Sequence, residues 1–340
     1  MAGSRTSLPQ PWDHAAMDAF LRPARAFAPA SIGNVAAGFD LLGAALAPID
    51  GSLLGDVVTA APAERPAFTL SGPYAEGLAR EDRPNLVLRV AEAFAARWGR
   101  PLPPLALHLE KRLPLASGLG SSASSIVATL AALQAALGDP LGLADLLALG
   151  AEAEGFYGGG PHADNIAPSL LGGLRLLTPG VGAGADAVAL PWPEDLRFVV
   201  VHPSMALPTA ASRGALPGAV PLGEAVGFAG NLAALVQALH TGDRELLARC
   251  LRDPLAEPHR APLVPGFRAV QAAAKEAGTL GCSLSGSGPS VFAVAGADRA
   301  PAVRAAMTAA FAKAGLGADA WICTLDRRGA RCLTEGPCAS

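Results

Sequence analysis

The sequence predicts a chain of mixed helices and strands that folds as two packed domains. Its 340 residues exceed the size at which one hydrophobic core usually stops growing. Because 51% of the residues are hydrophobic and 16% are charged, there is enough apolar material for two cores. Segments whose apolar residues recur at helical spacing alternate with short segments typical of strands, which indicates a mixed structure.

The N-terminal region predicts an extension followed by short strands. Residues 1–24 mix Pro, Trp, Asp, His and Arg without the apolar run and cleavage site of a secretory signal, so we expect a flexible extension and a cytoplasmic protein. A turn-rich segment over 29–40 leads into an apolar run over 41–46, where short strands joined by loops fit best.

The middle of the chain shows clear periodicity. Apolar residues recur at helical spacing over 85–97, and leucines alternate with other residues over 105–110, which predicts a helix and then a strand. A glycine-rich loop over 114–120 then leads into a helix predicted over 121–137. Another helix is predicted over 143–154, and a stretch very rich in glycine follows it.

The second half of the chain predicts a separate domain. The composition over 178–193 is typical of a loop, and the β-branched run over 198–201 is a short strand that could open this domain. We therefore place the boundary near Asp195, which gives domains over 25–194 and 195–340. The remaining predicted elements are helices over 222–240, 245–251, 266–277 and 301–314 and strands over 290–295 and 321–325.

Composition argues against several classes of partner. The formal net charge is −3, aromatic residues make up 5% of the chain, and no basic block is present, so we expect neither nucleic acid nor an anionic membrane as a partner. The long apolar stretches are interrupted by polar residues, so no transmembrane segment is predicted. The five cysteines form no CxxC pair, which favours reduced thiols over disulfides or a zinc site.

The loop over 114–124 has the composition of a phosphate-binding loop. Gly118 and Gly120 let backbone N–H groups approach an anion, and the helix that follows adds its free N-terminal donors. The hydroxyls of Ser121 and Ser122 can cap this helix or ligate a metal. A tight turn with a serine cap produces the same pattern, so the loop alone leaves both interpretations open.

The same loop also fits a different class of enzyme. Gly118-x-Gly120-x-x-Ala123 matches the dinucleotide-binding pattern, so a dinucleotide-dependent oxidoreductase is an alternative. That fold places an acidic residue at the end of the next strand, roughly 20 residues on. Asp139 instead lies in a turn directly after the predicted helix, which is the wrong context.

Two further segments carry polar groups suited to a site. Glu154, together with a loop serine, can supply the one or two hard oxygen ligands that ATP-bound magnesium takes from protein. His162, Asp164 and Asn165 lie together in a short loop next to glycines, which favours a site lining over core packing. The Ser/Gly loop over 285–290 is a third candidate, for which an ordinary turn is the alternative.

Taken together, these segments resemble the GHMP kinases, the superfamily named after galactokinase, homoserine kinase, mevalonate kinase and phosphomevalonate kinase. The resemblance lies in Pro-x-x-Ser-Gly-Leu-Gly-Ser-Ser-Ala at 114–123 and Ser-Gly-Ser-Gly-Pro-Ser at 285–290. Within the superfamily, the sequence is most similar to the homoserine kinases. The segments that carry this similarity are Ala-Pro-Ala-Ser-Ile-Gly-Asn-Val-Ala-Ala-Gly-Phe-Asp-Leu-Leu-Gly at 28–43, His-x-Asp-Asn-x-Ala-Pro at 162–168, Glu-Pro-His-Arg at 257–260 and Leu-x-Pro-Gly-Phe at 263–267.

The resemblance implies a fold and an activity. The fold would be α+β, with an N-terminal domain like a domain of a small-subunit ribosomal protein, a C-terminal ferredoxin-like domain and an active site in the cleft between them. The activity would be transfer of a phosphoryl group from ATP, with Mg²⁺, to the side-chain hydroxyl of L-homoserine in threonine biosynthesis. Members are commonly cytoplasmic homodimers.

The resemblance also implies roles for individual residues. Ser122 and Glu154 would ligate magnesium and, with Asn165 and Arg213, would form the catalytic group. Phosphoryl transfer depends mainly on positioning and charge stabilisation, so Asp164 is not expected to act as a base. The implied substrate-binding residues are Asn34, Asp40, His162, Asn165, Thr209, Arg213 and Arg260. The implied ATP-binding residues are Asn85, Pro114, Leu115, Ala116, Ser117, Gly118, Leu119, Gly120, Ser121, Ser122, Ala123 and Ser124.

One departure and two more alternatives accompany the resemblance. The family usually has Ala-Asn-Leu-Gly-Pro-Gly where this chain has Gly-Asn-Val-Ala-Ala-Gly at 33–38. A sibling kinase acting on shikimate, mevalonate or a diphosphocytidyl sugar alcohol shares the same motifs. A nucleotide-binding relative without catalysis is the other alternative, and the joint presence of Glu154, Ser122, Asn34 and Asp40 weighs against it.

Overall fold

The structure, a computed structural model, describes residues 21–80, 84–156, 162–178 and 186–333. The flexible extension expected over 1–24 therefore lies almost entirely outside the described residues, and the first strand, β1 (Ala24–Pro29), begins at its end. Part of the glycine-rich stretch after residue 154 is likewise outside them.

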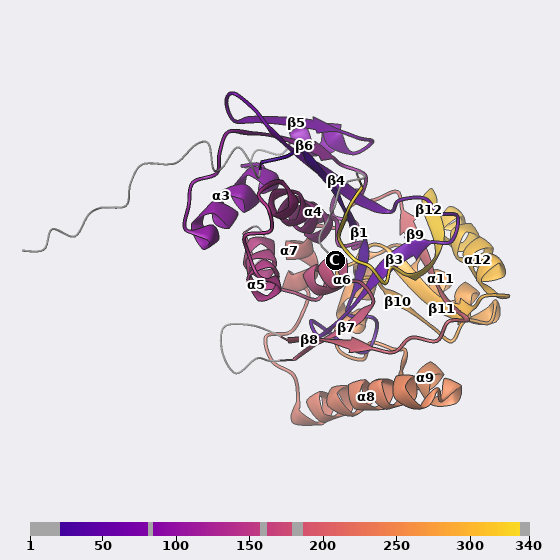
Figure 1. Cartoon of the computed structure of the whole chain (residues 1–340). Helices are drawn as coiled ribbons and strands as arrows, with labels where there is room; N and C mark the ends of the chain where they lie inside the picture. The colour runs from indigo at the N-terminus through magenta and orange to yellow at the C-terminus, as the bar shows by residue number, and fades with distance from the viewer. Residues whose placement is uncertain (1–20, 81–83, 157–161, 179–185, 334–340) are drawn as a thin grey trace, which may run out of the picture.

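The first sheet packs against a layer of three helices, and most of these elements come from the N-terminal part of the chain. Among the described residues, five strands run in the order β13-β1-β4-β6-β5, and only β5 and β6 pair in parallel. Helices α3, α4 and α5 lie along one side of this sheet (Figure 1). The new elements are β4 (Gly55–Pro62), β5 (Ala67–Ser71), β6 (Leu105–Glu110), β13 (Arg331–Cys332), α3 (Leu86–Trp98), α4 (Ser121–Ala136) and α5 (Leu143–Glu154).

Alternation along β6 and helical spacing along α3 explain why these elements pack together. Leu105, Leu107 and Leu109 are buried while the residues between them are partly exposed, as expected of a strand with one covered face. Val90 and Phe94 of α3 join the same core. Helix α4 is buried nearly all round because it contacts β1 and β4 as well as the neighbouring helices.

The second sheet is antiparallel and has both faces covered. In the described part of the chain its strands follow the order β10-β11-β9-β12-β3-β7-β8, with β2 paired to β3. On β9, Phe198 and Val200 enter one core, whereas Val199 and Val201 enter the other. The strands are β2 (Ser31–Gly33), β3 (Leu42–Pro48), β7 (Leu174–Thr178), β8 (Asp186–Leu190), β9 (Leu196–Pro203), β10 (Gly281–Leu284), β11 (Val291–Gly296) and β12 (Ala318–Leu325).

Helices cover this second sheet in two groups. Figure 1 shows α11 (Phe267–Glu276) and α12 (Ala300–Lys313) beside β9 to β12, and α8 (Leu222–Thr241) with α9 (Arg244–Cys250) beyond β7 and β8. Shorter helical segments complete the described chain. They are α2 (Ala75–Ala79), α6 (Ile166–Leu171), α7 (Thr209–Gly214), α10 (Glu257–Arg260) and a 3-10 turn at Ala261–Leu263.

Helix α8 is long and apolar enough to cross a membrane by length and composition, the one such helix in the described ranges. Only 22% of its apolar window is buried, and a single helix of this kind is weak evidence for a membrane span. Its second half packs Leu235 and Leu239 into the core, whereas Leu222 and Val226 in its first half are 80% and 63% exposed.

The long periodic segments are confirmed with ends shifted by a few residues at most, and one prediction is wrong. The segment over 178–193, expected to be a loop, contains β8, which pairs antiparallel with β7. Its short run of Ala and Val gives little periodicity, so β8 depends on its partner strand for its conformation. The expected division near Asp195 stays a prediction, and β3, from the N-terminal part of the chain, lies between β12 and β7 in the second sheet.

Three of the cysteines in the described ranges, Cys250, Cys282 and Cys323, are free. Cys250, Cys282 and Cys323 are buried, and Cys332 is partly buried. Burial raises the pKa of the Cys282 and Cys323 thiols well above the ordinary value, so both remain protonated at neutral pH. Cys338 lies outside the described residues.

Candidate active site

One cavity of about 380 Å³ collects most of the residues singled out in the sequence. It is lined by the glycine loop before α4, by the segments around Glu154 and Asn165, by α7 and by the second Ser/Gly loop. The implied site residues that line it are Asn34, Asp40, Asn85, Leu115, Ala116, Ser117, Gly118, Gly120, Ser121, Ser122, Glu154, His162, Asn165, Thr209, Arg213 and Arg260.

The glycine loop is shaped by left-handed backbone and by the second Ser/Gly loop packed against it. Gly118 and Gly120 have φ of 76° and 62°. A side chain at Gly118 would meet the carbonyl oxygens of Ser285 and Gly288, so only glycine fits this position. The Ser285 hydroxyl donates to the Gly118 carbonyl at 2.6 Å. The segment over 285–290 therefore packs against the glycine loop and holds it in position. Its Gly286 and Ser287 also line the cavity.

The N-terminus of α4 opens into this cavity. The helix begins at Ser121 after Gly120. Its first backbone N–H groups have no intrahelical partner, and no side chain caps them. Such donors and the helix dipole favour an anion at this end. The Ser121 hydroxyl is turned inward to the Leu113 carbonyl at 3.4 Å, which leaves Ser122 as the exposed serine of the pair.

Four of the implied ATP-binding residues are not brought to the cavity. Leu119 and Ala123 are fully buried, each in a different hydrophobic core. Ser124 is also buried, and its hydroxyl donates to the Ala28 carbonyl at 2.7 Å and accepts from the Asp56 N–H at 2.8 Å. Pro114 is buried as well. These four residues hold the loop and helix in place.

A buried cation that the sequence did not single out lies beside the loop. Lys111, directly after β6, pairs with the fully buried carboxylate of Asp56 on β4. Its ammonium also donates to the Ser121 carbonyl at 2.9 Å and to the Ser125 hydroxyl at 3.0 Å. Asp56 accepts further from the backbone N–H groups of Arg112 and Leu113. This network joins the sheet to the first turn of α4 and places positive charge at the cavity wall.

Two buried carboxyl groups, those of Glu154 and Asp164, line the cavity. Glu154, at the end of α5, has a carboxylate oxygen with no hydrogen-bond partner among the described residues. Burial and the charge of Asp164 raise the pKa of Glu154 to about 7, and burial and the charge of Asp40 raise the pKa of Asp164 to about 7. The unpartnered carboxylate oxygen of Glu154 and the exposed Ser122 hydroxyl line the same cavity, and both are oxygen donors of the kind that a magnesium ion takes from protein.

These two groups predict how stability depends on pH in metal-free protein. The ordinary pKa values are 4.5 for Glu154 and 3.8 for Asp164, so each group binds its proton more tightly in the folded chain than in the unfolded chain. The free energy of unfolding is therefore expected to fall as the pH rises from about 4 to about 7 and to level off above that.

Urea unfolding in the presence of a chelator at several pH values between 5 and 8 measures this dependence. Glu154→Gln and Asp164→Asn should each flatten the profile, because neither amide titrates. A variant profile as steep as that of the unmodified protein would show that the residue does not carry the effect.

The segment after β2 has unusual backbone geometry around Asn34 and Asp40, two of the implied substrate-binding residues. Asn34, Val35 and Ala36 have positive φ, and so does Asp40 at 55°. For a β-branched residue such as Val35 this is a strained conformation, and strain of this kind clusters at functional sites. The Asn34 side chain accepts from the Asp40 N–H at 3.0 Å and donates to the Gly286 carbonyl at 3.2 Å. These bonds fix the turn that presents Asp40 to the cavity.

The charged candidates meet at one end of the cavity. The Arg213 guanidinium pairs with the Asp40 carboxylate at 3.0 Å, and His162 Nδ1 lies 3.8 Å from Asp40 Oδ2. Burial, with the positive charge of Arg213 as a smaller contribution, lowers the pKa of His162. The buried Arg260 donates to the Gly286 carbonyl at 3.0 Å and lies over the Phe39 ring. Both arginines and one carboxylate therefore share this end.

Asn165 and Thr209 complete the polar lining. Asn165 accepts a hydrogen bond from the Ser31 hydroxyl at 2.9 Å and donates to the Asp164 carboxylate at 3.3 Å. Thr209 is the first residue of α7, which carries Arg213 one turn later. Residues missed by sequence reasoning also line the cavity, namely Leu78, Pro84, Leu86, Leu109, Lys111, Ser125, Pro208 and Ala210.

Asn85 has a structural role in addition to the ATP contact that the resemblance implies. Its side-chain oxygen accepts from the Val87 N–H at 2.9 Å, which caps α3. We expect Asn85→Ala to lower the free energy of unfolding by about 1 kcal/mol, whereas Asn85→Asp keeps the cap. Thermal unfolding of both variants measures this difference. An equal loss in the two would argue against the cap as its cause.

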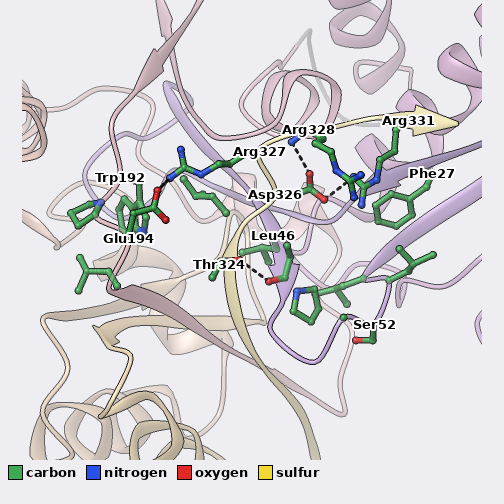
Figure 2. A pocket seen from close by; sticks show the side chains of 18 residues that line it. Phe27, Leu46, Ser52, Trp192, Glu194, Thr324, Asp326, Arg327, Arg328 and Arg331 are labelled. Carbon is green, nitrogen blue, oxygen red and sulfur yellow. Dashed lines mark hydrogen bonds and ion pairs between the residues drawn. The ribbon is translucent and has the colours of Figure 1, made fainter. Parts of the chain in front are cut away.

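A larger cavity of about 470 Å³ lies elsewhere and gathers none of these candidates (Figure 2). Two ion pairs cross its lining, one between Arg327 and Glu194 and one between Arg331 and Asp326. Because it contains neither the glycine loop nor the buried carboxyl groups, the smaller cavity is the candidate active site.

Comparison with known proteins identifies the family of the chain. The model of the GHMP kinase N-terminal domain matches residues 85–173, and that of the GHMP kinase C-terminal domain matches residues 235–313. A homoserine kinase from Cytophaga hutchinsonii is 33% identical, with a TM-score of 0.83 over 97% of this chain and 100% of that chain. A putative homoserine kinase from Listeria monocytogenes is 25% identical, with a TM-score of 0.70 over 92% of this chain and 99% of that chain.

A more distant structure shares the fold. The mevalonate kinase of L. major, solved with R-mevalonate, is 16% identical and gives a TM-score of 0.67 over 88% of this chain and 95% of that chain. The fold and these matches define the chain as a kinase with the expected two-domain α+β architecture. It belongs to the GHMP kinase family, whose members use ATP.

Proposed function

We propose that this kinase transfers the γ-phosphoryl group of ATP to the side-chain hydroxyl of L-homoserine, giving O-phospho-L-homoserine for threonine biosynthesis. The observation that carries the proposal is the charged end of the cavity, where Asp40 lies with Arg213 and Arg260. An amino acid presents an ammonium and a carboxylate together, and this end has groups for both. Mevalonate and shikimate carry a carboxylate without an ammonium, so they offer no cation to Asp40.

The nucleotide would bind at the glycine loop. Backbone donors of this loop and of the α4 N-terminus suit its phosphates, and the buried Lys111 adds positive charge nearby. The apolar lining formed by Leu78, Leu86 and Leu109, next to Asn85, suits a flat purine ring. A solved GHMP-fold structure holds AMPPCP and magnesium, which supports ATP and Mg²⁺ here.

The remaining residues of the cavity would bind the metal ion or position the substrate. Ser122 and Glu154 would bind Mg²⁺, which supplies charge neutralisation at the phosphates when bound. Arg213 and Arg260 would hold the substrate carboxylate, and Asp40 its ammonium. Asn34, His162, Asn165 and Thr209 would position the rest of the substrate. Positioning and charge stabilisation carry this reaction, so the proposal assigns no base role to Asp164. We further propose a cytoplasmic homodimer, as is common for the family.

Substrate profiling tests the proposal. ADP release from MgATP by the purified protein is measured with L-homoserine, L-threonine, L-serine, mevalonate and shikimate in turn. Turnover of L-homoserine far above the others supports the proposal. Preference for another alcohol would keep the kinase and discard this substrate, and no turnover with any acceptor would favour a nucleotide-binding role.

A further inference from the structure

The two groups proposed to hold opposite charges of the substrate are paired with each other. Arg213 Nη2 lies 3.0 Å from Asp40 Oδ1, and Arg213 Nη1 lies 3.3 Å from Asp40 Oδ2. This is the two-pronged geometry in which arginine and carboxylate interact most strongly. The side chains are 27% and 30% exposed, so the pair is accessible from the cavity that both residues line.

Neighbouring groups are held in place and cannot replace either member of the pair. Arg260 is buried and already donates to the carbonyl oxygens of Gly286 and Ser212. Asn34 holds the backbone of Asp40, which fixes the carboxylate in position. His162, at 3.8 Å, has a pKa lowered chiefly by burial, so it adds little positive charge at neutral pH. Separating Arg213 from Asp40 therefore leaves each charge in need of a new partner.

We propose that the Asp40–Arg213 pair makes the site selective for zwitterions, because only a ligand with both charges can replace both halves of the pair. The proposal rests on the function proposed above. The ligand ammonium would take the place of Arg213 at Asp40, and the ligand carboxylate would take the place of Asp40 at Arg213. One ion pair is lost and two are formed, with no change in covalent bonds.

A ligand with a single charge makes an unfavourable exchange. A hydroxy acid pairs with Arg213 but leaves the Asp40 carboxylate without its partner. An amino alcohol pairs with Asp40 but leaves Arg213 beside the second cation, Arg260. Leaving one member of a charge pair without a partner, after the ligand has displaced water from the cavity, reduces binding by about thirtyfold or more. The pair thus excludes alcohols that would otherwise fit by size.

Two ligands derived from homoserine separate this mechanism from simple recognition of each charge. Removing the ammonium gives 4-hydroxybutanoate, and removing the carboxylate gives 3-aminopropan-1-ol. If Asp40 only recognised the ammonium, Asp40→Asn would not change the binding of 4-hydroxybutanoate. If Arg213 must first leave Asp40, Asp40→Asn frees Arg213 and should tighten that binding by about tenfold.

Titration calorimetry with the three ligands tests the proposal without depending on turnover. In Asp40→Asn, the dissociation constant for homoserine is expected to rise at least thirtyfold while that for 4-hydroxybutanoate falls. In Arg213→Gln, the dissociation constant for homoserine is likewise expected to rise, while that for 3-aminopropan-1-ol falls. This variant tests the proposal if Asp40→Asn does not fold. Glu110→Gln is the matched control, because Glu110 pairs with Arg25 and Arg112 away from the cavity.

The outcomes are distinct. Weaker homoserine binding with tighter 4-hydroxybutanoate binding in Asp40→Asn supports the proposal. Weaker homoserine binding with unchanged or weaker 4-hydroxybutanoate binding overturns it and leaves the proposed function intact. If the unmodified protein neither binds nor phosphorylates homoserine, the proposed function fails and this inference fails with it.

Discussion

Asp56→Asn is expected to lower the free energy of unfolding by about 3–5 kcal/mol, because it removes one partner of a fully buried ion pair. The variant leaves the Lys111 ammonium buried with only the Ser121 carbonyl and the Ser125 hydroxyl as acceptors. The asparagine oxygen can still accept from the backbone N–H groups that follow Lys111, but the amide NH2 group then faces the ammonium in place of a carboxylate oxygen. Urea unfolding followed by circular dichroism measures the change.

The control is an ion pair of the same kind at the surface. Glu76 on α2 pairs with Arg80, the residue after this helix, and their side chains are 79% and 75% exposed, so Arg80→Ala should change stability by less than about 1 kcal/mol. In a double variant, Lys111→Met should recover part of the loss caused by Asp56→Asn, since no unpaired cation remains. A loss below about 1 kcal/mol in Asp56→Asn would contradict the buried-pair argument.

Glu154→Gln is expected to lower kcat at least about a hundredfold while leaving the fold intact. The loss follows from the proposed role of Glu154 as a magnesium ligand, since removal of one group that stabilises transition-state charge commonly has an effect of this size. The fold should tolerate the change because ionised Glu154 is buried and is repelled by Asp164. ADP release gives kcat, and thermal unfolding at pH 8 in metal-free protein gives the stability.

The same helix offers a matched control. Glu152 lies two residues earlier on α5, is exposed and pairs with Arg97, so Glu152→Gln should leave kcat unchanged. Activity of Glu154→Gln within threefold of the unmodified protein would remove Glu154 from the proposed metal site. A large loss of stability in Glu154→Gln would instead indicate that the carboxylate has a structural partner.

Sequence reasoning located the elements whose periodicity is strong. Helices α3, α4 and α5 and strand β6 were all predicted, because each has a long apolar face that must be buried. The short helices and the strands β4, β5 and β13 were not predicted. Their conformation depends on partners distant in sequence, and their local patterns are too short to indicate a period.

The candidate site divides in a similar way. The glycine loop and Glu154 stand out because their residue types suit phosphate and metal chemistry. Asp56 and Lys111 were missed because they are 55 positions apart and only the fold joins them. The one local signal was a lysine placed just before the glycine loop. The packing of the two Ser/Gly loops against each other was also not predicted, because the sequence of neither loop indicates which surface it contacts.

The position of β3 within the second sheet affects how the protein folds while it is being synthesised. Ala47 at the end of β3 accepts from Thr324 on β12, 277 positions later in the chain. On a ribosome, β3 emerges long before β12, so the sheet around it cannot close until most of the chain has been synthesised. Sheets built from such distant contacts fold slowly, and their unpaired edges can join other chains in the meantime. The nascent N-terminal part is therefore the stage at which this protein would depend most on chaperones.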